Sequence, residues 1–383
     1  MSSIAMAASA SAEGSTASGA TATKDPLLVR AARGEKVERS PVWMMRQAGR
    51  HMAVYRALVD KYPTFRERSE IPEVSLEVSL QPWRAYGVDG VILFSDILTP
   101  LPAMGVDFAS SEAGGIKIDP IRTREAFEKM TSAGPFEPEK ALPFVGDVLQ
   151  KLRKEVEPSG AAVLGFVGLP FTLGTYLVEG ATGTKTGFAE FRALRKSDPE
   201  LCKDILTLLA KNIGQYAIYQ IDNGAQMVQV FDSWAGHLEP EEFDEWAAPY
   251  QKMVVSAIKE VRPEVPVTIY MAPDTHSKEG ALLERLAASG VDVVSLDNTV
   301  DLSAARERLA AAGYPNIGLQ GNLDPVILRD GPPEKIVEET ERILKMAGDK
   351  GHVMNLGHGI EPTTPEPFAK LFVDTVQGYD HSQ

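Results

Sequence analysis

Residues 41–50 read PVWMMRQAGR, and this stretch sets how the rest of the chain is interpreted. The apolar run 42–45 is typical of a buried strand, and it leads directly to Arg46 and Arg50, which bracket a small Gln-Ala-Gly turn. Arginine is rarely buried without a partner, so the charged end of this run needs solvent, an acid or an anionic ligand. We predict a strand over residues 42–45 whose carboxyl end opens into a cleft.

The same pattern, a short apolar run followed by an amphipathic helical segment, repeats from Asp25 onward. Helix signals include Asp198 as an N-cap before Pro199, and Gly290 as the residue that ends a helix before the next strand. The expected strands are 42–45, 91–94, 162–167, 227–231, 267–271, 291–296, 317–320 and 352–356.

Eight strands that alternate with helices over roughly 350 residues indicate an α/β fold, a single-domain (β/α)8 TIM barrel. The competing interpretation is an open doubly wound sheet, which could form two domains. No break in composition occurs in the middle of the chain, and no G-x-G-x-x-G follows the first expected strand. These observations favour a barrel over residues 24–383.

Composition and charge exclude several classes of protein. The chain has 383 residues, 44% of them hydrophobic and 24% charged, as in a globular protein. A net charge of −14 argues against nucleic acid or an anionic membrane as a partner, and no apolar run is long enough to span a bilayer. The single cysteine, Cys202, lies in a helical pattern, and we expect it to be a buried thiol that forms no disulfide.

Residues 1–23 differ in composition from the remainder. They consist almost wholly of Ala, Ser, Thr and Gly, with Glu13 as their one acid and no lysine or arginine. Such a segment cannot bury enough apolar surface to offset its conformational entropy, so we expect a disordered tail. It resembles the remnant of an organelle transit peptide, although those usually contain arginine.

In a TIM barrel the active site lies at the carboxyl ends of the strands, so the residues that follow each expected strand are the candidates. Nearly every strand end carries polar groups, which indicates a cleft built around a polar ligand. The segments are RQAGR at 46–50, Asp96 in FSDIL, GLPFTLGTY at 168–176, Asp232, Ser233 and His237, Asp274, Asp297 and Asn298, QGNLDP at 320–325, and His358 in LGHG.

Arg46 and Arg50 are candidates for an anion clamp. Their spacing in a glycine-containing loop can direct two guanidinium groups into one concave space, where they bind carboxylate or phosphate. The simpler alternative is that they pair with Asp96, which follows an apolar run and is expected to be at least partly buried. Asp96 could instead accept N–H donors from a ligand or stabilise a developing cation.

The other candidates also have structural alternatives. Tyr176 could be a rim aromatic and Ser233 a helix N-cap, whereas His358, between two glycines, is well suited to donate to a carboxylate. The sequence contains no G-x-S-x-G, phosphate-binding loop or HExxH motif, and its histidines are scattered. We therefore expect no metal site and no covalent nucleophile. The inventory suits a multiply anionic substrate and a cationic intermediate.

The motifs PVWMMRQAGR, FSDIL, GFVGLPFTLGTY, FDSWAG, VDVVSLD, QGNLDP and NLGHGI occur in this order along the chain. Together they resemble the uroporphyrinogen decarboxylase family over nearly all of the sequence outside the tail. The resemblance implies a homodimeric barrel that acts as a carboxy-lyase in haem and chlorophyll biosynthesis without metal or organic cofactor. Its reaction would convert the four acetate side chains of uroporphyrinogen III into methyl groups, giving coproporphyrinogen III and CO₂.

The resemblance also implies residue roles. Arg46 and Asp96 would be catalytic, with Asp96 accepting the pyrrole N–H groups at the centre of the macrocycle. Whether Arg46 or a water molecule that it holds delivers the proton stays open, because a guanidinium is almost never deprotonated. The substrate contacts would come from Arg46, Gly49, Arg50, Asp96, Tyr176, Ser233 and His358, with the loop backbone at Gln47 and Ala48 also lining the cleft.

The sequence departs from the family pattern at His51, at the strand exit 271–277 and at Asn298, which stands where a tryptophan is usual. HMAVYR and KYPTFRERSE look closest to plant and algal forms, so we expect the chloroplast stroma, with the cytoplasm as the alternative. Two other functions remain open: a corrinoid-linked methyltransferase, which would need a zinc ligand set, and a non-catalytic tetrapyrrole-binding protein. A single cysteine argues against the first.

Overall fold

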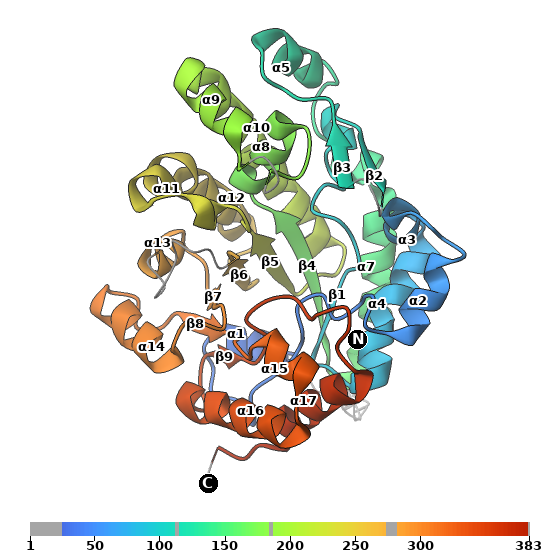
Figure 1. Ribbon diagram of the computed structural model, residues 1–383, viewed down its shortest axis with the longest axis vertical. Helices are drawn as coiled ribbons and strands as arrows, with labels where there is room; N and C mark the ends of the chain where they lie inside the picture. The colour runs from blue at the N-terminus through green and yellow to red at the C-terminus, as the bar shows by residue number, and fades with distance from the viewer. Residues whose placement is uncertain (1–24, 112–114, 184–186, 273–281, 382–383) are drawn as a thin grey trace, which may run out of the picture.

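The computed structural model describes residues 25–111, 115–183, 187–272 and 282–381, and the predicted tail lies outside them. Parallel strands run through the middle of the molecule and helices surround them, in a TIM-barrel-like α/β fold (Figure 1). Within the described residues, one seven-stranded parallel sheet has the order β1-β4-β5-β6-β7-β8-β9. Its strands are β1 (Gly90–Ile92), β4 (Ala162–Gly168), β5 (Met227–Phe231), β6 (Val267–Tyr270), β7 (Val293–Ser295), β8 (Gly318–Gln320) and β9 (His352–Val353).

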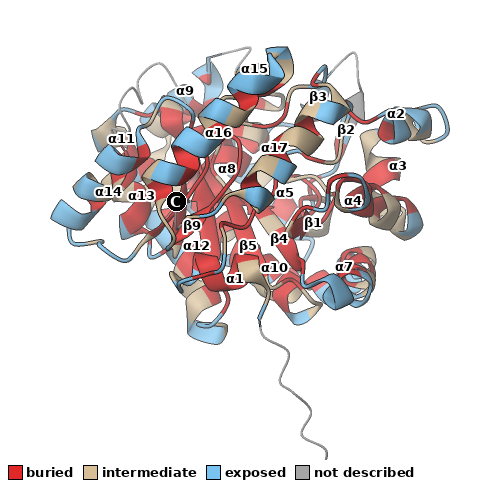
Figure 2. Ribbon diagram, turned by 90° about the horizontal axis from the view of Figure 1, so that it is seen from below, coloured by how far each residue is buried: buried red, intermediate tan, exposed pale blue. Residues whose placement is uncertain are grey.

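The strand register follows the chain order, as expected when each crossover helix returns to the next strand. The longest pairing aligns β4 with β5 from Leu164 opposite Met227 to Gly168 opposite Phe231. The strands are rich in β-branched and apolar residues and nearly all of their residues are buried, as in sheets covered on both faces. Figure 2 shows the buried strands inside and helices with exposed outer faces around them.

The predicted strand over residues 42–45 is corrected by the structure. This segment makes one parallel bridge, Val42 to Met354, and no ladder. It still lies between β9 and β1, because Trp43 N donates to the Met354 carbonyl (3.3 Å) and Asp89 N donates to the Val42 carbonyl (2.8 Å). The segment therefore closes the wall of the barrel without becoming a regular strand.

Side chains take the place of the missing ladder. The N–H groups of Met44 and Met45 donate to Gln47 Oε1 (3.0 Å) and Asn355 Oδ1 (2.9 Å), and Val42 N donates to an Asp89 carboxylate oxygen (2.9 Å). Buried backbone donors need partners, and here side-chain oxygens supply them. The early end of strand pairing also lets the chain turn at Arg46.

The remaining predicted strands are confirmed, with shorter bounds at several ends. A two-stranded antiparallel hairpin, β2 (Phe108–Ser111) with β3 (Gly115–Ile118), lies outside the barrel and was not predicted from the sequence. It is attached to helix α3, where Arg66 N–H groups donate to the Phe108 carbonyl (3.2 Å) and to Asp107 (2.9 Å).

The helices form the outer layer. Asp198 caps α10 by accepting from Leu201 N (2.9 Å), and Cys202 lies buried in that helix, so both sequence predictions are confirmed. No helix of the described residues has the length and apolarity needed to cross a membrane. The α-helices are α1 (Leu27–Ala32), α2 (Ala53–Val59), α3 (Phe65–Glu70), α4 (Pro72–Tyr86), α5 (Arg124–Thr131), α6 (Pro138–Ala141), α7 (Pro143–Val156), α8 (Pro170–Glu179), α9 (Ala189–Ser197), α10 (Pro199–Asp222), α11 (Pro240–Trp246), α12 (Ala248–Val261), α13 (Leu283–Ala288), α14 (Leu302–Ala311), α15 (Pro325–Asp330), α16 (Pro333–Ala347) and α17 (Glu366–Gly378). Short 3₁₀ turns cover Pro102–Met104, Glu157–Ser159 and Ala235–His237.

Candidate active site

A cavity of about 1090 Å³ opens at the carboxyl ends of the barrel strands. Ligand sites in proteins commonly measure about 300–1,000 Å³, so this cavity suits a large ligand. The structure brings every predicted site residue to its lining: Arg46, Gln47, Ala48, Gly49, Arg50, Asp96, Tyr176, Ser233 and His358. Their individual roles remain predictions.

Arg46 and Arg50 present exposed side chains to this cavity. Within the described part of the chain, neither guanidinium forms an ion pair or hydrogen bond, so pairing with Asp96 is not what the structure contains. Arg46 has a φ of 61°, a left-handed conformation that costs energy for a residue with a side chain. The loop thus holds two guanidinium groups available to an anion.

Asp96 follows β1, and hydrogen bonds with the next residues of the chain hold it in place. Its carboxylate accepts from Leu98 N (3.0 Å), and its backbone N donates to Thr99 Oγ1 (3.2 Å). Burial is the main cause that raises the pKa of Asp96, and the negative charge of Glu70 raises it further. A ligand that donates N–H groups to this carboxylate would favour its ionised form.

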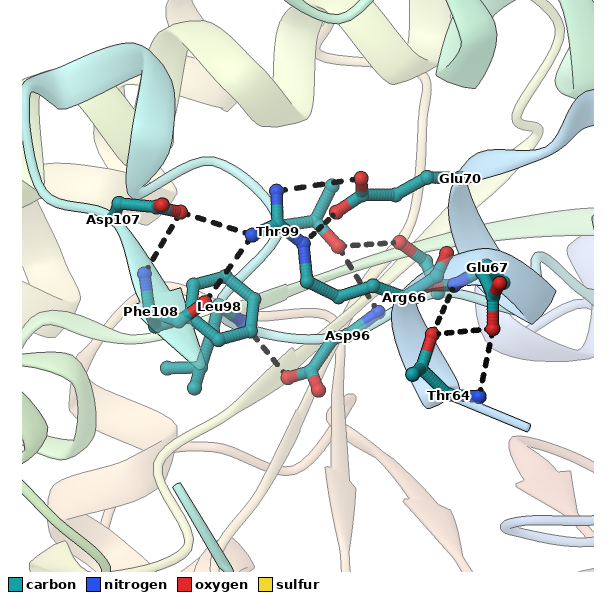
Figure 3. A network of polar contacts seen from close by, with 11 residues as sticks. Thr64, Arg66, Glu67, Glu70, Asp96, Leu98, Thr99, Asp107 and Phe108 are labelled. Carbon is teal, nitrogen blue, oxygen red and sulfur yellow. Dashed lines mark hydrogen bonds and ion pairs between the residues drawn. The ribbon is translucent and has the colours of Figure 1, made fainter. Parts of the chain in front are cut away.

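An ion-pair network lies beside Asp96 (Figure 3). Arg66 binds Glu70 on the same helix (2.9 Å) and Asp107 before β2 (2.9 Å). In Figure 3 the Asp96 carboxylate points away from the Glu70–Arg66 pair. Because Arg66 offsets the charge of Glu70, it limits the repulsion that Glu70 exerts on Asp96.

His358 is oriented by the backbone. The N–H of Gly359 donates to His358 Nδ1 (2.7 Å), so the proton of the neutral ring sits on Nε2. Burial, and secondarily the positive charge of Arg46, lower the pKa of His358 below its ordinary value. His358 is therefore a neutral N–H donor at pH 7, suited to a carboxylate oxygen.

Tyr176 comes from α8 and packs against Trp234, with ring centroids 4.1 Å apart. Burial raises its pKa to about 12 and the negative charge of Asp96 raises it further, so its hydroxyl is neutral at pH 7. Ser233 lines the cavity and does not cap a helix, because the following turn begins after Trp234.

Gln47 lines the cavity, while its side chain is fully buried. Its Oε1 accepts from Met44 N and its Nε2 donates to the Gly90 carbonyl (2.9 Å), so this side chain holds the loop on β1. From this loop, a ligand can be reached by the backbone and by the exposed side chains of Arg46 and Arg50, but not by the side chain of Gln47.

Sequence reasoning missed the apolar walls of the cavity and a further arginine, Arg68, in its lining. Several of the aromatic residues lie in the strand-end motifs FSDIL, GFVGLPFTLGTY and FDSWAG, but the sequence reasoning there considered only the polar members. The aromatic residues of the walls are Tyr55, Phe65, Phe94, Phe166, Phe231, Trp234 and Tyr270.

The departures from the family pattern have different outcomes. Residues 273–277 of the predicted strand exit, Asp274 among them, lie outside the described residues. Asn298 packs its backbone against Gly357, so it contacts the chain segment beside His358. His51 is buried and its Nε2 lies 3.2 Å from the Tyr86 hydroxyl, and burial lowers its pKa to about 4.

Asp232, a polar candidate at the end of β5, is structural. Its carboxylate is fully buried and accepts from the N–H and hydroxyl of Thr172 (2.9 and 2.7 Å) and from Gln251 Nε2 (2.8 Å). Burial raises its pKa from 3.8 to about 6. The carboxyl therefore holds the loops after β4 and β5 together.

We expect Asp232→Asn to change how stability depends on pH. Because the folded pKa is raised, this carboxyl contributes stability below pH 4 that is lost as pH rises through about 6. The loss is on the order of 3 kcal/mol. The amide that Asp232→Asn introduces can donate to Gln251 Oε1, which has no partner among the described residues.

Urea unfolding of both proteins at pH 4 and pH 7 measures this effect. The variant should gain stability relative to the native chain at the higher pH. Parallel stability curves for the two proteins would show that the carboxyl does not titrate in this window.

The described residues contain no group of three or more His, Cys, Asp or Glu side chains arranged to hold a metal ion. The sequence profile of the family described as Uroporphyrinogen decarboxylase (URO-D) matches residues 23–379. The chain belongs to the uroporphyrinogen decarboxylase family. The resemblance to this family that PVWMMRQAGR and the later motifs indicated is therefore confirmed.

Curated relatives support the family assignment along the whole match. A protein named uroporphyrinogen decarboxylase from Prochlorococcus marinus is 51% identical over 351 residues, covering 91% of this chain and 95% of the relative. A protein of the same name from Synechococcus sp. (strain CC9902) is 51% identical over 348 residues, covering 91% and 94%.

Solved structures show the fold. A methyltransferase from Methanosarcina mazei has a TM-score of 0.74 at 20% identity, covering 92% of this chain and 99% of its own. A B12-independent methionine synthase from Shewanella sp. W3-18-1 has a TM-score of 0.54 at 15% identity, covering 80% and 85%. At these identities, this member of the uroporphyrinogen decarboxylase family shares only its architecture with such enzymes.

Proposed function

We propose that this chain decarboxylates uroporphyrinogen III to coproporphyrinogen III, as an enzyme of tetrapyrrole biosynthesis. The observation that carries the proposal is the composition of the cavity at the barrel mouth. Exposed guanidinium groups of Arg46 and Arg50 share one large, aromatic-walled space with the half-buried carboxylate of Asp96. The family profile and the relatives named uroporphyrinogen decarboxylase support it.

The cavity suits the substrate in two ways. The arginines and the Nε2–H of His358 provide donors for the carboxylates at the edge of the macrocycle. Asp96 provides an acceptor for the inward-pointing pyrrole N–H groups. These N–H groups would replace lost water as partners of the carboxylate, which lowers its pKa and keeps it ionised in the complex.

The reaction proceeds through a cationic ring. A proton adds to a pyrrole α-carbon, and the acetate C–C bond then breaks, so that CO₂ leaves and the electron pair neutralises the ring. A proton adds to the exocyclic carbon to form a methyl group, and the first proton leaves the α-carbon. Each cycle consumes one proton per carboxylate removed.

Asp96 accelerates this sequence because it lies where positive charge develops. An ionised carboxylate at the ring centre stabilises the cation more than the neutral substrate, which is the difference that lowers the barrier. We propose Arg46, or a water molecule that it binds, as the source of the first proton. Tyr176 lies within electrostatic reach of both Arg46 and Asp96 and would orient the same acetate.

We further propose a homodimer in the chloroplast stroma. The cyanobacterial origin of the relatives is consistent with a plastid protein, and the serine- and alanine-rich residues 1–23 resemble a transit-peptide remnant. Sedimentation of the purified protein tests the dimer, and imaging of the tagged full chain tests the location.

An assay of the purified protein tests the activity. We expect anaerobic conversion of uroporphyrinogen III to coproporphyrinogen III and CO₂ with no added cofactor and at an unchanged rate in the presence of a chelator. Loss of turnover with the chelator would contradict the cofactor-free mechanism. Binding of the substrate without CO₂ release would instead support a tetrapyrrole-binding protein.

A further inference from the structure

Glycine flanks His358 on both sides, and the conformational freedom of the glycine backbone does not explain why. Neither Gly357 nor Gly359 takes a positive φ, so their conformations are open to residues with side chains. The reason for glycine at these positions is therefore the space that a Cβ atom would occupy.

The two positions differ in what a Cβ atom would meet. At Gly357 it would lie 2.2 Å from the backbone N of Asn298 and 2.7 Å from its Cα. At Gly359 it would lie 2.5 Å from Cδ of Arg46 and 3.0 Å from both Cγ and Nε. Gly357 thus accommodates another backbone segment, whereas Gly359 accommodates the Cγ–Cδ stem of one exposed side chain.

We propose that Gly359 is a positioning residue that sets the path of the Arg46 side chain across the cavity. Its N–H also donates to His358 Nδ1, so the same residue fixes the proton of His358 on Nε2. One peptide unit thereby aligns two of the proposed carboxylate donors. This inference rests on the proposed function and explains how Arg46 and His358 are placed relative to each other in that site.

Alanine at position 359 separates the two contributions. It keeps the N–H that orients His358, but its methyl group forces the Arg46 stem to move by about 1 Å, enough to cost about ten- to a hundredfold in activity. We expect kcat/KM of Gly359→Ala to fall by that factor while its urea midpoint stays near the native value. Gly378→Ala is the matched control, because a Cβ there meets nothing within 4 Å.

A double-mutant cycle with Arg46→Ala tests the mechanism of the effect. Arg46→Ala removes the stem, so a methyl group at 359 then has nothing to displace, and Gly359→Ala should cause no further loss. An equal loss in both backgrounds, or activity of Gly359→Ala within twofold of native, overturns the proposal.

The affinity for coproporphyrinogen III, measured for the same four proteins, gives a second readout that needs no turnover. Native protein that binds this product but releases no CO₂ contradicts the proposed function. The coupling between positions 359 and 46 can still be present or absent in that case, so the two failures are distinguishable.

Discussion

Asp96→Asn should lower turnover about a thousandfold, the scale seen when one preorganised charge-stabilising group is removed from an active site. The amide is nearly the same size and its oxygen can still accept from Leu98 N, so the loop should keep its shape. It lacks the negative charge that stabilises the ring cation, and its N–H groups would oppose the pyrrole N–H groups. Initial rates of CO₂ release measure the loss.

Although Asp96→Asn should lower activity, it should not lower the stability of the folded protein. Burial raises the pKa of Asp96, so its ionised form costs folding free energy at neutral pH, and Asp96→Asn should unfold at an equal or higher urea concentration. Asp232→Asn is the matched control for activity, because it makes the same change at a buried aspartate that has no role in the proposed reaction. It should therefore keep its turnover. If Asp96→Asn retains activity within a fewfold, Asp96 is structural.

Arg46→Gly should also abolish most activity, with a loss of about a hundredfold or more, because the proposed guanidinium contact with a substrate carboxylate disappears with its side chain. It should nevertheless be more stable than Arg46→Ala. The φ of 61° at this position is easily adopted by glycine, whereas alanine retains the strain of about 1 kcal/mol. Urea midpoints of the two variants compare this directly.

The comparison between these two variants isolates the backbone from the side chain. Both lack the guanidinium, so their activities should agree within a few fold, while their stabilities differ. Equal stabilities would show that the left-handed conformation of residue 46 is not maintained in solution.

The alternation of apolar runs with helical segments predicted most of the architecture. Met227–Phe231 matches its predicted bounds, and β4 extends one residue beyond its own. The run 42–45 was misassigned because composition cannot reveal that Gln47, Asn355 and Asp89 replace strand neighbours as hydrogen-bond acceptors. The β2–β3 hairpin was not predicted, because each of its strands is only four residues long and neither is a continuous apolar run like those that marked the barrel strands.

For the site, position after a strand was a useful guide, since the residues predicted to contact the substrate all line one cavity. It could not separate side chains that face the cavity from those that face the protein. Gln47 and Asp232 follow the pattern of their neighbours and yet point into the core, where Gly90 and Thr172 bind them. Only three-dimensional packing distinguishes these cases.

The irregular segment 42–45 limits which substitutions this enzyme can accept during evolution. Its donors are satisfied by side chains of Gln47, Asp89 and Asn355, so closure of the barrel depends on residue identity there and not on generic backbone pairing. The same segment leads directly into Arg46. Closure of the wall and placement of the anion clamp are thus subject to one shared evolutionary constraint, and amide or carboxylate positions that never touch the ligand should covary with those that do.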